Sequence, residues 1–193
     1  MKFEQLPLQT ERLLLRPLVA EDAAALFAMF SDPRVVRYGS SPPWPDISEA
    51  ETFIAQALQA QAEGSSLRLG LERRSDGQLI GQCTFFSVYE QNRRAEIGYT
   101  MAFEAWGQGF MNEALQALVA YGFTVMDLHR IEADIDPRNT ASERSLLRLG
   151  FRYEGLLRER WIVAGEISDS GLYGLLRSEW DQSRLASSSA LPV

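Results

Sequence analysis

Apolar and polar residues follow one another along this chain with two different spacings. Short segments rich in β-branched and aromatic residues, bounded by charges or turn residues, are typical of strands. Longer segments that repeat an apolar residue every third or fourth position are typical of helices with one buried face. The pattern predicts strands over residues 13–19, 67–73, 79–89, 95–101, 131–135, 153–157, 160–164 and 172–176, and helices over residues 21–30, 48–62, 110–123 and 141–149.

Cap and turn residues separate these segments. Ser48 and Glu51 have the spacing of a capping box, in which the two side chains satisfy free amides at a helix start. The run Ser75-Asp76-Gly77 is a hairpin turn signal, and Gly150 follows the last helix, where a left-handed cap is needed. The order of elements predicts an α/β protein, a mixed sheet with helices on both faces.

The chain shows no internal repeat and no linker, so we expect one domain over residues 1–180. Residues 181–193 are rich in Ser and Ala, and we expect them to form a disordered tail. A chain of 193 residues, 46% hydrophobic and 23% charged, is long enough to bury its own core without a disulfide or a metal.

Net charge and the supply of reactive residues argue against several classes of protein. A net charge of −7 disfavours nucleic-acid binding and favours cationic partners such as amines, polyamines or basic peptides. No apolar stretch reaches membrane-spanning length and no signal-peptide region opens the sequence, so we expect a cytoplasmic protein without a membrane partner. The single Cys83 and single His129 supply neither a zinc cluster nor a disulfide, and a hydrolase triad would depend entirely on His129.

The most informative stretch is Gly107-Gln108-Gly109, between a predicted strand and a predicted helix. Glycines at such a turn let the backbone approach a ligand, and free amides at a helix start bind anions such as phosphate. Two familiar phosphate loops do not fit, because GxxxxGK[ST] needs a lysine that is absent and GxGxxG needs glycine where Asn112 stands. A tight turn without a ligand is the alternative interpretation.

A second group of residues favours the interpretation of the glycine turn as a ligand site. It runs Asp136-Pro137-Arg138-Asn139-Thr140-Ala141-Ser142 and ends in Leu149-Gly150-Phe151. Together the two stretches resemble the GNAT acyl-CoA N-acetyltransferases, whose pyrophosphate motif Gln/Arg-x-x-Gly-x-Gly/Ala falls on residues 104–109, with the acidic Glu104 at its first position. The chain is most similar to the ribosomal-protein N-terminal acetyltransferase (RimJ/RimL-type) branch, and the likeness extends from residues 10–16 through 95–99 to 176–180.

The resemblance implies a mostly antiparallel central sheet that splays at one parallel strand pair, residues 95–101 and 131–135. Acetyl-CoA would lie in this opening as co-substrate, its pantetheine beside the backbone of residues 101–103 and its pyrophosphate on the helix start at residues 107–111, with no metal. The reaction would be direct attack of a neutral amine on the thioester, which requires proton removal and oxyanion stabilisation. The implied cofactor-binding residues are Met101, Phe103, Trp106, Gly107, Gln108, Gly109, Phe110, Met111, Asn139 and Ser142.

Glu96 is the candidate general base, acting directly or through a water, because it occupies the acidic position that many relatives have on this strand. The alternative is a solvated or salt-bridged strand carboxylate near Arg93 and Arg94. The two interpretations remain open at the level of the sequence.

Asn139 matches the family asparagine that contacts CoA or a bound water. Its alternative role is a helix N-cap, although Thr140 with Glu143 could form that cap instead. Many relatives have, seven residues beyond this asparagine, a tyrosine that protonates the leaving thiolate, and this chain has Leu146 there. Ser142 matches the serine of the RimJ/RimL-type branch and is the candidate general acid. The alternative interpretation is an ordinary serine in the first turn of a helix.

The acceptor amine is the least determined part of the expected function. In relatives the acceptor site is built around the first helices and the late hairpin, which makes Tyr38, Trp44, Asp46, Trp161 and Glu166 candidates, with ordinary packing as the alternative. One expected acceptor is the N-terminal amine of a ribosomal protein or peptide, and the other is a small amine such as a polyamine, an amino acid or an aminoglycoside. A third interpretation is a non-catalytic CoA-binding module. We expect a monomer or a homodimer.

Overall fold

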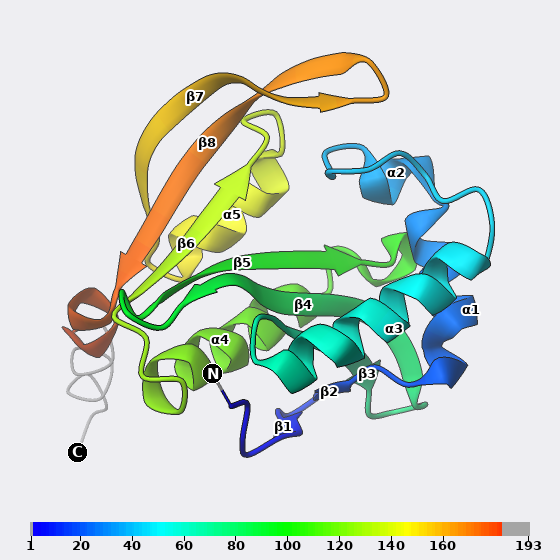
Figure 1. Cartoon of the computed structure of the whole chain (residues 1–193), viewed down its shortest axis with the longest axis horizontal. Helices are drawn as coiled ribbons and strands as arrows, with labels where there is room; N and C mark the ends of the chain where they lie inside the picture. The colour runs from blue at the N-terminus through cyan, green and yellow to red at the C-terminus, as the bar shows by residue number, and fades with distance from the viewer. Residues whose placement is uncertain (1, 183–193) are drawn as a thin grey trace.

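Eight strands form one sheet in the computed structural model, which describes residues 2–182 (Figure 1). The sheet order is β1-β2-β3-β4-β5-β6-β8-β7, and neighbouring strands are antiparallel except for the parallel pair β5 and β6. The predicted mixed and mostly antiparallel sheet is therefore confirmed. The strands are β1 (Leu8–Gln9), β2 (Leu13–Pro17), β3 (Leu67–Arg73), β4 (Gln78–Tyr89), β5 (Arg94–Met101), β6 (Arg130–Ile135), β7 (Arg152–Val163) and β8 (Glu166–Leu176).

Helices cover both faces of this sheet, as the order of elements predicts. The helices are α1 (Ala23–Phe30), α2 (Pro33–Val36), α3 (Ser48–Glu63), α4 (Phe110–Thr124) and α5 (Thr140–Arg148), with 3₁₀ turns at Ala20–Asp22 and Phe103–Ala105. Buried residues of α1 and α3 pack with Leu18 and Leu79 on one face. Buried residues of α4 and Leu146 of α5 belong to the larger core on the other face.

Alternation along the strands decides which side chains face which helices. Leu67, Leu69 and Leu71 of β3 are fully buried in the core with α4, so Arg68 lies on the opposite face, toward α1 and α3. In the same way, Ala95 and Ile97 of β5 are buried with α4, and Glu96 between them lies on the α1–α3 face.

The parallel pair is short. Main-chain pairing between β5 and β6 joins Arg94 to Arg130, Ala95 to Ile131 and Glu96 to Glu132. Beyond Glu96 the two strands no longer pair with each other and diverge, as Figure 1 shows. The predicted splay between residues 95–101 and 131–135 is therefore present.

The late hairpin differs from the prediction of separate strands over residues 153–157 and 160–164. β7 is continuous, and a bulge between Leu157 and Trp161 replaces the expected break. At the bulge, Glu159 has a φ of 52°, and its amide donates to Asp169 Oδ1 at 2.8 Å. Ala164 and Gly165 close the hairpin with positive φ at both positions, as the favoured two-residue hairpin turn requires.

Two helix starts also differ from the sequence-based expectation. The capping box predicted at Ser48 is wrong, because Ser48 is already the first residue of α3 and the carboxylate of Asp46 accepts its amide at 2.8 Å. The short helix α2 was not predicted, and the carboxylate of Asp32 caps it by accepting the Arg34 amide at 2.9 Å. Residues 177–182 are helical, and the rest of the expected tail, residues 183–193, lies outside the described residues.

Candidate active site

A cavity of about 860 Å³ lies where β5 and β6 part. Glu96 and Thr100 of β5 and Asp134 of β6 line it from the α1–α3 face. Asn139 and Ser142 line it from the side of α5. The cavity therefore passes through the splay and connects the two faces of the sheet, so that groups bound on opposite faces can meet beside Glu96.

Glu96 is free of the two arginines that precede it. Arg93 pairs with Asp127 at 3.3 Å, and Arg94 pairs with Glu132 across the strand pair. Burial raises the pKa of Glu96, and the nearby carboxylates of Glu132 and Asp134 raise it further. A half-buried carboxylate with a raised pKa is suited to accept a proton near neutral pH. This geometry favours the general-base interpretation over the salt-bridge alternative.

Two residues that the sequence analysis did not single out lie beside the candidate catalytic groups. Ser87 has a φ of 49° at a register shift of β4, and its hydrogen bond to Glu96 acts against the rise of the Glu96 pKa. Tyr99 of β5 donates its hydroxyl to the Ser142 carbonyl at 3.4 Å, across the splay. Burial raises the pKa of Tyr99 to about 12, so it stays protonated at neutral pH. A positive φ at a non-glycine residue cannot be read from sequence, which explains why Ser87 was missed.

Asn139 is the N-cap of α5, because its Oδ1 accepts the Ser142 amide at 3.1 Å. The suggestion that Thr140 with Glu143 caps this helix is therefore wrong, since Thr140 is the first helical residue. Asn139 nevertheless lines the cavity, so its amide nitrogen remains available to a ligand. Leu146, at the place of the family tyrosine, is fully buried in the core.

The glycine turn has the backbone that its sequence predicts. Gly107 has a φ of 73° and Gly109 a φ of 80°, both in the left-handed region. α4 starts without a side-chain cap, and the amides of residues 107–111 donate to no group within residues 2–182. These amides and the positive end of the helix dipole make an anion site, as expected for a pyrophosphate.

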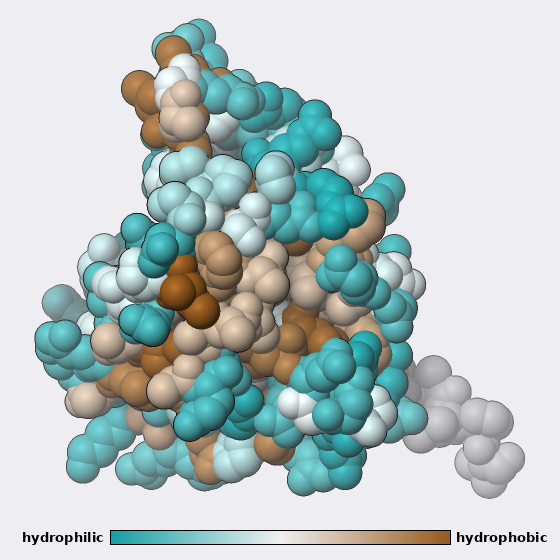
Figure 2. All heavy atoms as spheres, turned by 90° about the vertical axis from the view of Figure 1, so that its right-hand side faces the viewer, coloured by the Kyte–Doolittle hydropathy of each residue, from teal (hydrophilic) through white to brown (hydrophobic). Residues whose placement is uncertain are grey.

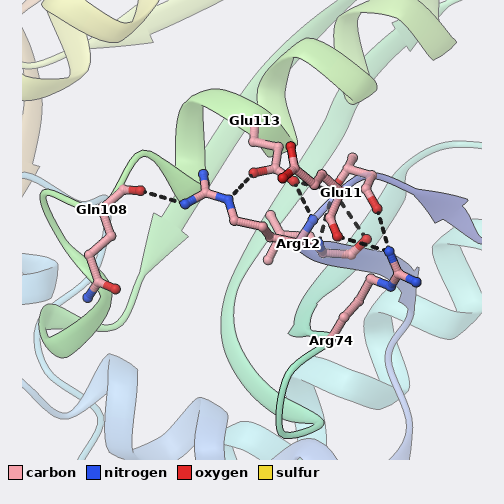
Figure 3. A network of polar contacts seen from close by, with 7 residues as sticks. Glu11, Arg12, Arg74, Gln108 and Glu113 are labelled. Atoms are coloured by element: carbon pink, nitrogen blue, oxygen red, sulfur yellow. Dashed lines mark hydrogen bonds and ion pairs between the residues drawn. The ribbon is translucent and has the colours of Figure 1, made fainter.

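Arg12 supports this turn from the side of β2 (Figure 3). Its Nη1 donates to the Gln108 carbonyl at 2.9 Å, and its Nε donates to Glu113 of α4 at 2.6 Å. Glu113 also accepts the Arg12 amide at 2.8 Å. The network therefore ties the glycine turn to the first turn of α4 and to the start of β2.

The segment before the turn offers backbone groups and two exposed rings. The Trp106 indole donates to the Met101 carbonyl at 2.8 Å, and Arg34 lies 3.7 Å from the Phe103 ring centroid. The carboxylate of Glu104 lies 3.9 Å from Arg34 and is largely exposed. The side chains of Met101 and Phe110 are buried in the core, so only their main-chain groups can contact a ligand.

Most of the acceptor-site candidates lie around the same cavity. Tyr38, Trp44, Trp161 and Glu166 line it, whereas Asp46 does not and instead accepts the Ser48 amide at the start of α3. Figure 2 views the side of the molecule on which α2 lies. Apolar side chains are exposed on this side, and more are exposed at the top, where the β7–β8 hairpin projects. Ile162 and Ile167 of this hairpin are 70% and 55% exposed.

A splayed parallel strand pair, next to an uncapped helix that follows a glycine turn, defines an acyl-CoA-dependent transferase site. The sequence matches the Acetyltransferase (GNAT) domain over residues 12–152, more than half of the chain. The chain therefore belongs to the GNAT acetyltransferase family. This confirms the resemblance found in the sequence.

Individual relatives agree with the family. A Bacillus licheniformis protein described as an uncharacterized N-acetyltransferase, p20, is 40% identical over 173 residues, covering 90% of this chain and 97% of that one. The ribosomal protein uS5-alanine N-acetyltransferase of Escherichia coli is 28% identical over 186 residues, covering 92% and 94%. The structure of Mycobacterium smegmatis RimJ in complex with CoA-disulfide superposes with a TM-score of 0.81 at 29% identity, covering 92% and 89%. The protein is thus an N-acetyltransferase that uses acetyl-CoA.

The described residues fit that co-substrate. The uncapped amides of residues 107–111 suit its pyrophosphate, and the unpaired edge of β5 beyond Glu96 leaves main-chain groups for its pantetheine. Within residues 2–182, no group of three or more His, Cys, Asp or Glu side chains could hold a metal ion. In the same range, no helix is long and apolar enough to cross a membrane.

Proposed function

We propose that this enzyme acetylates a primary amine by direct attack, with Glu96 as general base and Ser142 as the group that faces the leaving sulfur. The observation that supports the proposal most strongly is the carboxylate of Glu96, which lines the cavity at the closed end of the splay and pairs with neither Arg93 nor Arg94. Acetyl-CoA, when bound, supplies the acetyl thioester. Glu96 accepts the proton that the amine loses, directly or through a water.

The α5 side of the cavity supplies the second half of the mechanism. Ser142 lies in the first turn of α5 and lines the cavity opposite Glu96. In this proposal its hydroxyl donates a hydrogen bond to the developing thiolate, and the Asn139 cap holds the backbone of this turn. Main-chain amides of the unpaired edge of β5 are available to an oxyanion.

The acceptor that we propose is the N-terminal amine of a protein or peptide. The support is the Escherichia coli relative, whose name assigns it to an alanine of ribosomal protein uS5. A small amine is the competing acceptor. We also propose a cytoplasmic location, since the single cysteine, Cys83, is a free and buried thiol.

Thiol release from acetyl-CoA tests the proposal, with peptides of different N-termini compared with polyamines, amino acids and aminoglycosides. Saturable release with one peptide class supports the peptide acceptor. Release with small amines alone keeps the chemistry and overturns that acceptor. If acetyl-CoA binds and no amine releases thiol, the catalytic roles of Glu96 and Ser142 are wrong.

Three variants test the residue roles. Glu96→Gln should lower kcat/KM roughly 100-fold or more and flatten its rise with pH, because the deprotonated carboxylate is lost. Asp134→Asn is the competing test: if its profile flattens and that of Glu96→Gln does not, Asp134 is the base. Ser142→Ala should slow turnover roughly tenfold with acetyl-CoA affinity kept, and an unchanged turnover would remove Ser142 from the mechanism.

A further inference from the structure

Arg68 is a cation inside the cavity without a carboxylate partner. It lies on the α1–α3 face of β3 and lines the cavity. Its Nη1 donates to Gln82 Oε1 at 3.2 Å, and its guanidinium carbon lies 4.1 Å from the Phe53 ring centroid. No carboxylate within residues 2–182 forms an ion pair with it. Most of its N–H donors therefore have no acceptor.

The other arginines around the cavity are either neutralised or exposed. Arg138 pairs with Asp136 and Glu166, both at 2.6 Å, and Arg160 pairs with Asp134 at 2.9 Å. Arg37 is exposed to water and needs no partner. Among these, only Arg68 is half-buried with an unpaired charge, and burial lowers the pKa of its guanidinium to about 10. A partly buried cation without a counter-ion costs stability, so it is suited to bind an anion from outside.

The sheet register places Arg68 within reach of the candidate base. Arg68 pairs with Thr84 on β4, and Thr84 pairs with Gly98 on β5, so the three form one row across the sheet. Glu96 lies two residues from Gly98 along β5 and on the same face. With ordinary strand spacings, the Cα atoms of Arg68 and Glu96 are about 12 Å apart. A single small molecule or chain end can therefore contact both residues.

The anion that fits Arg68 does not belong to the co-substrate phosphates. The uncapped amides of residues 107–111 do not line the cavity, whereas Arg68 does. Gln82 and Thr84 flank Arg68 with neutral polar groups, and Phe53 covers one side of the guanidinium. This is a built pocket for a small planar or tetrahedral anion, because the free guanidinium edge can donate two hydrogen bonds at once.

We infer that Arg68 binds a carboxylate or phosphate group of the acceptor, so that the substrate is an amine that also carries an anion. The inference rests on the proposed function, since it places the amine beside Glu96. It disfavours polyamines, whose distal ammonium groups would face the Arg68 charge. It favours free amino acids of suitable length, or peptide N-termini followed by an acidic residue.

Matched acceptor pairs test the inference by thiol release. ω-Amino acids of increasing chain length are compared with their amides, aminoalkylphosphonates with the corresponding alkylamines, and amidated peptides with Asp at positions two to four with their Asn counterparts. The wild-type enzyme should prefer the anionic member of at least one pair roughly 10- to 100-fold in kcat/KM. The pair that shows the preference identifies the carboxylate or the phosphate as the anion.

Variants then assign the preference to Arg68. Arg68→Gln should abolish it while acetyl-CoA binding is kept, and Arg68→Lys should restore part of it. Arg148→Gln, which removes an exposed charge outside the cavity lining, should leave it unchanged. Equal rates for both members of every pair, or a preference that survives in Arg68→Gln, would overturn the inference while leaving the proposed function intact. Silence with every amine would overturn both. The wild-type comparison decides even if Arg68→Gln fails to fold.

Discussion

Asn139 shows how one side chain can serve the backbone and a ligand together. Its oxygen accepts the Ser142 amide and so caps α5, which leaves its NH₂ group available to a ligand in the cavity that the residue lines. The two roles that the sequence presents as alternatives use different atoms of the same amide group. They can therefore be separated by substitution.

Asn139→Asp keeps an oxygen that can cap the helix and removes the NH₂ donors, whereas Asn139→Ala removes both. We expect Asn139→Ala to lose about 1 kcal/mol of stability, because a cap is lost, and Asn139→Asp to stay near wild type. Both should have lower kcat/KM if the NH₂ group contacts the ligand. Thermal denaturation with steady-state kinetics checks this, and full activity in Asn139→Asp would leave only the cap.

Glu96 should cost stability at neutral pH. Burial, with help from Glu132 and Asp134, makes its pKa higher in the folded than in the unfolded chain. The folded state therefore binds this proton more tightly, and stability falls as pH rises through the raised pKa. Glu96→Gln should have a higher Tm than wild type at pH 7, with the difference vanishing near pH 4.

Glu113 provides a control for which the expected change in Tm has the opposite sign. Burial would raise its pKa, but hydrogen bonds from Thr10 and Arg12 outweigh this and hold the pKa below its ordinary value. The ionised carboxylate therefore stabilises the folded state at neutral pH, and this stabilisation is lost as pH falls, so Glu113→Gln should lower Tm at pH 7. Equal Tm shifts in both variants would show that the Glu96 pKa is not raised.

At the scale of the elements, the turn before α4 combines an unusual backbone with a proposed ligand. Gly107 and Gly77 have nearly the same φ, 73° and 72°, and a Cβ added at either would meet nothing within 4 Å. Gly107→Ala and Gly77→Ala should thus lose similar stability, about 1 kcal/mol each. Only Gly107→Ala should weaken acetyl-CoA binding. Calorimetry with both variants measures the difference, and equal affinities would place the pyrophosphate elsewhere.

The network in Figure 3 makes a second prediction for the same element. Arg12 holds the Gln108 carbonyl, whereas Arg74 donates to the carbonyls of Thr10 and Glu11 and does not touch the turn. Arg12→Gln should weaken acetyl-CoA binding roughly tenfold, because the turn loses a charged hydrogen bond. Arg74→Gln should bind acetyl-CoA like wild type. Comparable losses in both variants would indicate a general effect of the β2 start, without a specific role for Arg12.

At the scale of the molecule, periodicity and turn residues are enough to predict the sheet, the two helical layers and the glycine turn. They do not predict which strand residues become enclosed. Arg68 alternates with buried leucines and its place in the sequence predicts a solvent-facing residue, but it lines the cavity and the Phe53 ring of α3 covers one side of its guanidinium. Glu96 follows two arginines in sequence, yet partners from elsewhere in the chain occupy both. Both facts depend on elements distant in sequence.

The short pairing of β5 and β6 divides the sheet into two parts. Strands β1 to β5 form one part and strands β6 to β8 the other, and the pairs from Arg94–Arg130 to Glu96–Glu132 join their main chains. Met101 and Ile135, at the ends of the two strands, lie furthest from these pairs, whereas Glu96 lies in the last of them. The gap is therefore widest where a bulky group can enter, and the sheet's own pairing fixes the backbone of Glu96 at its narrow end.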